Sequence, residues 1–183
     1  MNKIDSKIVG QLTQDKTFPD WWRSELISIA FFDDMKLPVI FMDFEPEHDL
    51  NFLNEADTAL NEFLRLNSVK RFELSSLVFK NCTDFLDSVE TLESDGQFRN
   101  LSSDKEVWKF VHPKEIYVTR RPYNDCDIYV QVACECDWEQ EHGLQLVFRQ
   151  GKKLTRISVQ DGHLTEADAF DIPDSEDKLL SQF

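Results

Sequence analysis

Two short segments near the C-terminal end combine carboxylates with histidine, the residue types most used in acid–base catalysis. Glu141 directly precedes His142, and Asp161 lies two residues before His163. Such pairs would suit a small hydrolase in which a histidine acts as the general base. However, no serine or cysteine nucleophile stands at a recognisable spacing from either pair, and local turns explain both segments. We therefore expect no catalytic residue and keep the hydrolase as an alternative hypothesis.

The cysteines are the next candidates for reactive or metal-binding groups. Cys134 and Cys136 flank a single residue on an expected strand, which is a poor geometry for a disulfide between them. A zinc site would need cysteines at C-x-x-C spacing or a pair of histidines, and His142 alone does not complete such a set. We expect four reduced thiols, no metal and no cofactor. The four cysteines are Cys82, Cys126, Cys134 and Cys136.

A third group of potential ligands is the acidic run Glu45-Pro-Glu-His-Asp49. It lies between an expected strand and the start of an expected helix, where the helix dipole favours carboxylates and where Asp49 or Asn51 can cap the helix. We interpret the run as capping and solvated residues.

The distribution of charge is more informative than any of these motifs. The net charge is −15, and 25 of the 35 Asp and Glu residues lie in four windows that contain no Lys or Arg. Such windows predict a negative surface potential that attracts basic proteins and repels nucleic acid and anionic membranes. The basic clusters at 120–121 and 149–156 are expected to pair with carboxylates. The acidic windows are residues 37–64, 81–98, 122–148 and 157–177.

Hydrophobic periodicity predicts an α+β fold, a largely antiparallel sheet with two or three helices packed on one face. Residues 1–20 are expected to form a weakly structured lead-in, and residues 21–183 a single domain. Two hairpins are expected, one with a four-residue loop at 33–36 and one around Gly151. The expected strands are 25–32, 37–44, 115–121, 127–138, 143–149 and 153–159, the expected helices are 52–64, 68–89, 103–111 and 165–170, and 93–100 is expected to be a loop.

The strand expected at 127–138 is the predicted partner-binding element. Its apolar residues alternate with polar ones, so that Cys134 and Cys136 would face the core and the opposite row would face solvent. Exposed carboxylates around aromatic side chains resemble the charged rim and central anchors of a protein interface. The acidic window 37–64 is the next candidate. The predicted binding residues are Tyr129, Glu135, Asp137, Trp138, Glu139 and Glu141.

Two sequence blocks carry a resemblance to a known group of proteins. The block Glu141-His-Gly-Leu-Gln-Leu-Val-Phe148, followed by Asp161-Gly-His-Leu-Thr165, resembles a family of uncharacterised small acidic bacterial proteins. The segments Trp22-Arg-Ser-Glu25, Phe41-Met-Asp-Phe44 and Glu115-Ile-Tyr-Val118 are similar to it as well. The resemblance implies no catalytic assignment. By analogy, small acidic proteins of this kind resemble immunity proteins of bacterial toxin systems.

These observations favour a non-enzymatic acidic protein that binds a basic partner, in particular an immunity protein that neutralises a toxin domain. The N-terminus has no apolar leader and no run of about 18 apolar residues occurs, so we expect a cytoplasmic protein. Besides the hydrolase, an acidic regulatory adaptor is an alternative.

Overall fold

The computed structural model describes residues 2–89 and 96–182. An eight-stranded sheet runs through the molecule, and a separate two-stranded ribbon, β4 (Ile27–Ile29) with β5 (Met35–Leu37), lies beside it. All neighbouring strands of the large sheet are antiparallel except β6 and β7. In spatial order the large sheet contains β1 (Lys3–Ser6), β2 (Gly10–Gln14), β3 (Trp22–Ser24), β6 (Val39–Phe41), β7 (Val111–Arg120), β8 (Ile128–Cys136), β9 (Leu144–Arg149) and β10 (Lys153–Ser158).

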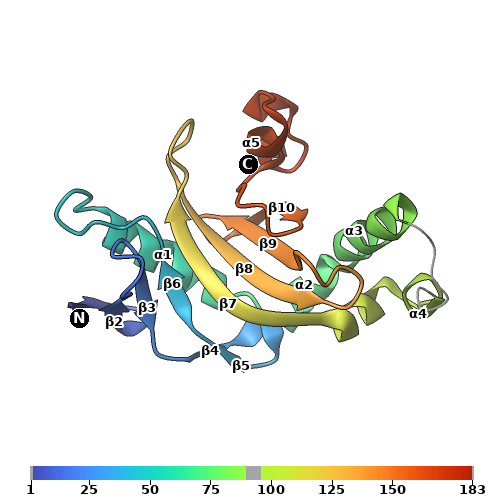
Figure 1. Ribbon diagram of the computed structural model, residues 1–183, viewed down its shortest axis with the longest axis horizontal. Helices are drawn as coiled ribbons and strands as arrows, with labels where there is room; N and C mark the ends of the chain where they lie inside the picture. Colours follow the sequence, from blue (N-terminus) through green and yellow to red (C-terminus); the bar gives the residue numbers. More distant parts are fainter. Residues whose placement is uncertain (1, 90–95, 183) are drawn as a thin grey trace.

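The principal helices, α1 (Phe52–Leu64), α2 (Ser68–Glu73) and α3 (Ser75–Ser88), cover one face of the sheet (Figure 1). The predicted apolar stripe of α1 is confirmed, because Phe52, Ala56, Leu60 and Phe63 are buried. These side chains pack on the inward row of β7, β8 and β9 to form the main core. The expected α+β class is therefore confirmed. The other described helices are η1 (Ala30–Phe32), α4 (Gly96–Arg99), η3 (Asp104–Phe110), α5 (Glu166–Phe170), η4 (Asp174–Glu176) and η5 (Leu180–Gln182).

The N-terminal region differs from the prediction. Residues 1–20 were expected to be weakly structured, yet β1 and β2 form a hairpin there. Asp57 of α1 is buried and accepts a hydrogen bond from the Ser6 hydroxyl. Its second oxygen accepts a bond of 2.8 Å from the Lys7 backbone N–H. The hairpin depends on this contact with a distant helix. Since the segment itself contains few apolar residues, its sequence does not predict a strand.

The predicted hairpin of residues 25–32 and 37–44 is only partly correct. β4 and β5 pair as expected, but the chain then separates at Pro38, and β6 joins the large sheet between β3 and β7. Proline interrupts a ladder because it has no N–H to donate, so the long apolar run divides into two short strands.

Three helix details also differ. The expected helix 68–89 is divided into α2, which the Asn67 side chain caps, and a separate helix α3. Residues 96–99 form α4 within the expected loop, of which residues 93–95 lie outside the described residues. Ser103 does accept a capping bond from Lys105, but the helix that it starts is a 3₁₀ helix. No described helix has both the length and the apolar character needed to cross a membrane.

Candidate functional site

The strand predicted to bind a partner is present as β8, but the outer face of β8 is partly covered. The segment after β10 crosses this face, and Leu164 packs on Tyr129 and Val147. Tyr129 is completely buried, and its hydroxyl donates a hydrogen bond of 2.7 Å to Asp125. Tyr129 is therefore not available as an exposed anchor, contrary to the prediction. The alternating pattern could not reveal this, since the covering segment lies over 30 residues later in the chain.

Two further predicted binding residues are also buried. The Trp138 side chain belongs to the main core, so the aromatic anchor expected beside the carboxylates is absent from the surface. Glu139 is buried and uses one carboxylate oxygen to accept backbone N–H groups of Glu141 and His142. It stabilises the turn between β8 and β9 and does not face a partner.

The remaining predicted carboxylates are exposed. Glu135 pairs with Lys114 at 2.8 Å, and Asp137 pairs with the His112 ring at 2.7 Å. Glu141 is exposed in the turn, with one oxygen 4.0 Å from the His142 ring. This end of β8 thus keeps acidic side chains, but cationic neighbours accompany them and no exposed aromatic residue of the predicted set remains.

The residues of the alternative hydrolase lie in different environments. His142 contacts Glu139 at 3.0 Å in the turn after β8. Asp161 pairs with Arg156 and also accepts the backbone N–H of His163. His163 lines a hollow beside α5, and His142 is not among the residues lining that hollow. The geometry therefore supplies no observation in favour of this alternative.

Two of the four cysteines, Cys134 and Cys136, occupy the positions that alternation predicts. Cys134 and Cys136 face the core, Cys82 is buried on α3, and Cys126 is exposed. Burial raises the pKa of the Cys136 thiol to about 12 and raises that of Cys134 as well, which opposes thiolate formation. Within the described residues, no three His, Cys, Asp or Glu side chains are arranged to hold a metal ion.

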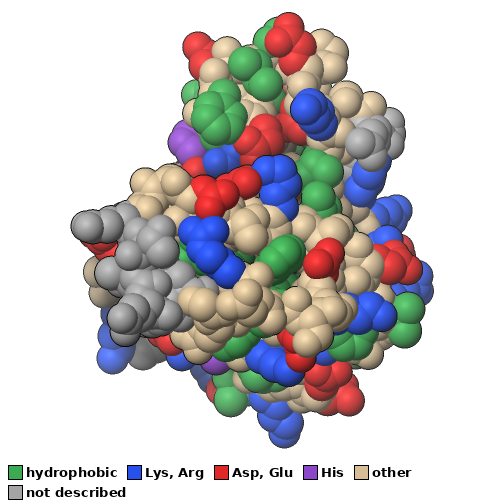
Figure 2. Space-filling view, turned by 90° about the vertical axis from the view of Figure 1, so that its right-hand side faces the viewer, with side chains coloured by type: hydrophobic (Ala, Val, Ile, Leu, Met, Phe, Trp, Pro, Cys, Tyr) green, Lys and Arg blue, Asp and Glu red, His purple; other side chains and the backbone are tan. Residues whose placement is uncertain are grey.

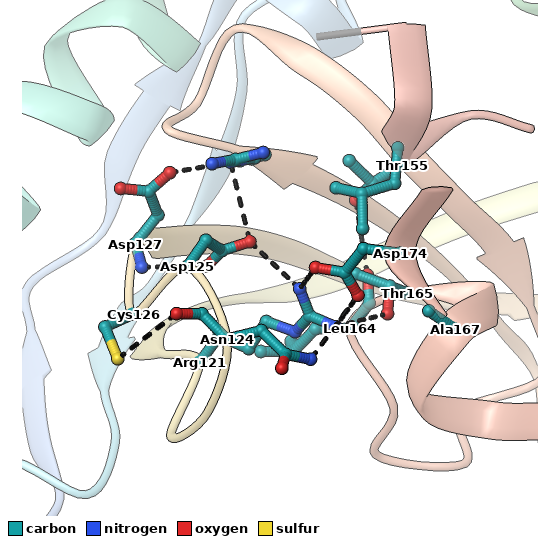
Figure 3. A network of polar contacts seen from close by, with 12 residues as sticks. Arg121, Asn124, Asp125, Cys126, Asp127, Thr155, Leu164, Thr165, Ala167 and Asp174 are labelled. Carbon is teal, nitrogen blue, oxygen red and sulfur yellow. Dashed lines mark hydrogen bonds and ion pairs between the residues drawn. The ribbon is translucent and has the colours of Figure 1, made fainter. Parts of the chain in front are cut away.

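Arg121 lies at the centre of a buried electrostatic cluster (Figure 3). Its guanidinium group, 1% exposed, contacts Asp168 at 2.6 Å, Asp174 at 2.7 Å and Asp125 at 2.9 Å. These carboxylates raise the pKa of Arg121 although burial opposes the charged form. Because Asp168 and Asp174 belong to the C-terminal segment, the cluster ties that segment to the end of β7.

The other arginines of the predicted basic clusters pair in the same way. Arg120 contacts Asp49 and Glu55, so that residues expected only to cap or solvate α1 also bind the sheet. Many carboxylates of the acidic windows are therefore neutralised locally. At the α3 and α4 end, Lys and Arg side chains lie interspersed with Asp and Glu (Figure 2). In the 149–156 cluster, Arg149 pairs with Asp125 and Asp127, and Arg156 pairs with Asp161 and Glu166.

A hollow of about 630 Å³ at the opposite end of the sheet combines apolar and acidic walls. Trp22 and Phe44 are buried at its base, and the Trp22 indole N–H donates a hydrogen bond of 3.0 Å to the Phe44 carbonyl. The Phe44 ring also stacks on Phe52 of α1 at a centroid distance of 4.6 Å. These contacts fix the base. The volume falls within the range of about 300–1,000 Å³ typical of ligand pockets.

The rim of this acidic hollow carries Asp20, Glu45 and Glu47. Among the described residues, neither Asp20 nor Glu47 has an ion-pair partner, whereas Glu45 pairs with the exposed His48 ring. Among the described lining residues, Lys3 is the only lysine or arginine, and it donates a hydrogen bond to Gln11. Uncompensated carboxylates above an apolar base are the features expected of a site for a cation with an aliphatic stem.

Sequence reasoning found only part of this hollow. The acidic run at 45–49 stands out in the sequence but is explained there by capping, and Asp49 does accept the Phe52 N–H at 3.1 Å. Asp20 and Trp22 were missed as site residues because they fall at the boundary between the expected lead-in, residues 1–20, and the domain. The aromatic sequence Phe18-Pro-Asp-Trp-Trp22 was the available signal, since such a concentration of rings requires a packing partner.

No curated protein and no solved structure matches the chain. A family model described as "Domain of unknown function (DUF6985)" matches residues 8–164. This match covers most of the chain, and the protein therefore belongs to this family of unknown function.

Proposed function

We propose that this protein is a non-enzymatic acidic module that binds a basic protein, and that its partner is a bacterial toxin domain that it neutralises in the cytoplasm. The observation that carries the proposal is the acidic hollow, in which Asp20 and Glu47 lack ion-pair partners among the described residues. The toxin assignment additionally uses the analogy between small acidic proteins and immunity proteins.

The hollow suits the side chain of an exposed lysine or arginine. The methylene groups of such a side chain would lie against Trp22 and Phe44, and the cationic head would reach Glu45 or Glu47. Asp20 and Glu47, which have no ion-pair partner among the described residues, have the most to gain from this contact, because their charge is not already compensated. The net charge of −15 would speed the approach of a basic domain.

A toxin that acts on a polyanionic substrate needs a cationic cleft, and an acidic protein can occupy that cleft in place of the substrate. In this mechanism no reaction is required of the bound protein. The same negative potential opposes binding of nucleic acid and of anionic membranes by the module itself.

The test is co-expression of the protein with the product of the adjacent gene, the gene that lies next to the one encoding this protein. We expect the two proteins to co-purify as a stable complex, and we expect cells that express the gene product to survive only when this protein is co-expressed. Complex formation without any protection would support the regulatory adaptor instead. If no complex forms at low salt, the proposal is wrong.

A further inference from the structure

Strand β1 is the terminal strand of the large sheet, and it borders the acidic hollow. The N–H of Gln14 donates to the carbonyl of Asn2 at 3.0 Å, and the ladder pairs Ile4 with Leu12. In an antiparallel pair, alternate residues direct their N–H and C=O groups toward the neighbouring strand. The backbone groups of Lys3 and Asp5 therefore point away from β2, where the described sheet has no further strand.

The edge is held in a fixed conformation. At its end the Ser6 hydroxyl donates to Asp57 of α1 and accepts the backbone N–H of Val9 at 3.0 Å. The Lys7 N–H donates to the same carboxylate at 2.8 Å. An edge held in place by a helix loses little conformational entropy when another strand pairs with it.

The edge and the hollow form one continuous surface. Asn2, Lys3 and Ile4 of the edge region line the hollow together with Glu45 and Glu47. In Figure 1 the N-terminal strands lie at one end of the sheet, beside the segment that precedes α1. A peptide paired with β1 would place alternate side chains on the side of the hollow.

We propose that β1 accepts an extended, basic segment of the partner protein as an additional antiparallel or parallel strand, with one lysine or arginine side chain in the acidic hollow. This inference rests on the proposed function and names the mode of binding. Backbone bonds to Lys3 and Asp5 would supply affinity, and the carboxylates would select a cationic side chain. Because β1 is short and carries the charged residues Lys3 and Asp5, it disfavours pairing with apolar edge strands of other proteins.

The first test uses a capped ten-residue peptide of alternating lysine and valine, with a glutamate and valine peptide as the control. We expect the lysine peptide to bind at low salt and to slow amide hydrogen exchange at Lys3 and Asp5. The Ile4 amide, already bonded to β2, is the internal reference and should change little. Binding that leaves the Lys3 and Asp5 amides unprotected would overturn the inference.

The second test compares Asp5→Pro with Asp5→Ala. Both variants remove the carboxylate, but only proline removes the outward N–H, and proline is tolerated on sheet edges. We expect Asp5→Pro to bind the lysine peptide about fivefold to tenfold more weakly than Asp5→Ala, consistent with the loss of one hydrogen bond. Equal binding by both folded variants would contradict strand addition.

The outcomes separate this inference from the proposed function. If the adjacent gene product binds but does not slow hydrogen exchange at the Lys3 and Asp5 amides, strand addition is wrong and the proposed function stands. If neither the gene product nor the lysine peptide binds, both proposals are wrong.

Discussion

Replacing Arg121 with methionine should loosen the C-terminal segment before the rest of the fold. Methionine keeps an unbranched stem of similar length but removes the charge that contacts Asp125, Asp168 and Asp174. Those three carboxylates would then repel one another without a cation between them. The matched control is Arg23→Met, which removes a single ion pair to Glu115 at the surface.

The expected cost follows from the exposure of the groups involved. Removing one partner of a buried ion pair costs about 3–5 kcal/mol. Asp168 and Asp174 are 28% and 36% exposed, so water would partly replace the guanidinium, and we expect the low end, about 3 kcal/mol. Arg23 is 46% exposed, and its loss should cost about 0–1 kcal/mol. In a domain of this size about 3 kcal/mol corresponds to a Tm lower by about 6–12 °C.

Urea unfolding gives the free energy of unfolding, and amide hydrogen exchange locates the change. In Arg121→Met, we expect exchange to accelerate at Asp168 and Ile172, whose N–H groups bond within the C-terminal segment. Exchange in the centre of β8 should be affected only as far as global stability falls. If Arg121→Met costs no more than Arg23→Met and leaves exchange at Asp168 and Ile172 unchanged, the Arg121 cluster does not hold this segment.

Three further results are expected. First, the pH dependence of stability should follow Asp174, whose pKa is lowered mainly by its hydrogen bond from Arg121. The difference in free energy of unfolding between wild type and Arg121→Met should be fully present above about pH 5 and should shrink as pH falls below about 4. A difference that stays constant with pH in urea titrations would contradict this. Second, DTNB should titrate one thiol, Cys126, in the folded protein and four in denaturant, whereas rapid reaction of a second thiol in the folded state would place Cys82, Cys134 or Cys136 outside the core. Third, Gly151→Ala should lower the free energy of unfolding in urea by at least about 2 kcal/mol, since the φ of Gly151 is +67° and an added Cβ would lie 1.9 Å from the Ala59 carbonyl oxygen. Gly162→Ala, with φ +80° and open space around the added Cβ, should lower it by only about 1 kcal/mol. Equal losses would show that backbone strain alone, and not the close contact, sets the cost.

The elements with strong local signals were predictable. Helix α1 has an unbroken apolar stripe, and the β9–β10 hairpin has a glycine-containing turn between two apolar strands. By contrast, β1 and β2 form a polar hairpin at the edge of the sheet that depends on Asp57, and β6 joins β7 in parallel across about 70 residues of intervening chain. Such non-local pairings leave no local pattern in the sequence.

The candidate site was predictable only in its chemistry. The charge windows correctly indicated many carboxylates, and the prediction that arginines would pair with them is confirmed at Arg120 and Arg121. Which carboxylates remain without a cation depends on how distant segments meet. Burial of Tyr129 under Leu164 and the exposure of Glu47 both follow from that arrangement.

The most direct test of the proposed function compares two triple variants that change the net charge equally. One carries Asp20→Asn, Glu45→Gln and Glu47→Gln at the acidic hollow. The other carries Glu135→Gln, Asp137→Asn and Glu141→Gln at the end of β8. Association and dissociation rates with the adjacent gene product would be measured across salt concentrations after thermal unfolding has verified both folds.

We expect both variants to associate somewhat more slowly, because each loses three negative charges. Only the hollow variant should also dissociate faster, by about tenfold or more, since its carboxylates would contact the partner directly. A hollow variant that dissociates at the wild-type rate, while the β8 variant does not, would place the binding surface at the end of β8 and contradict a binding role for the acidic hollow.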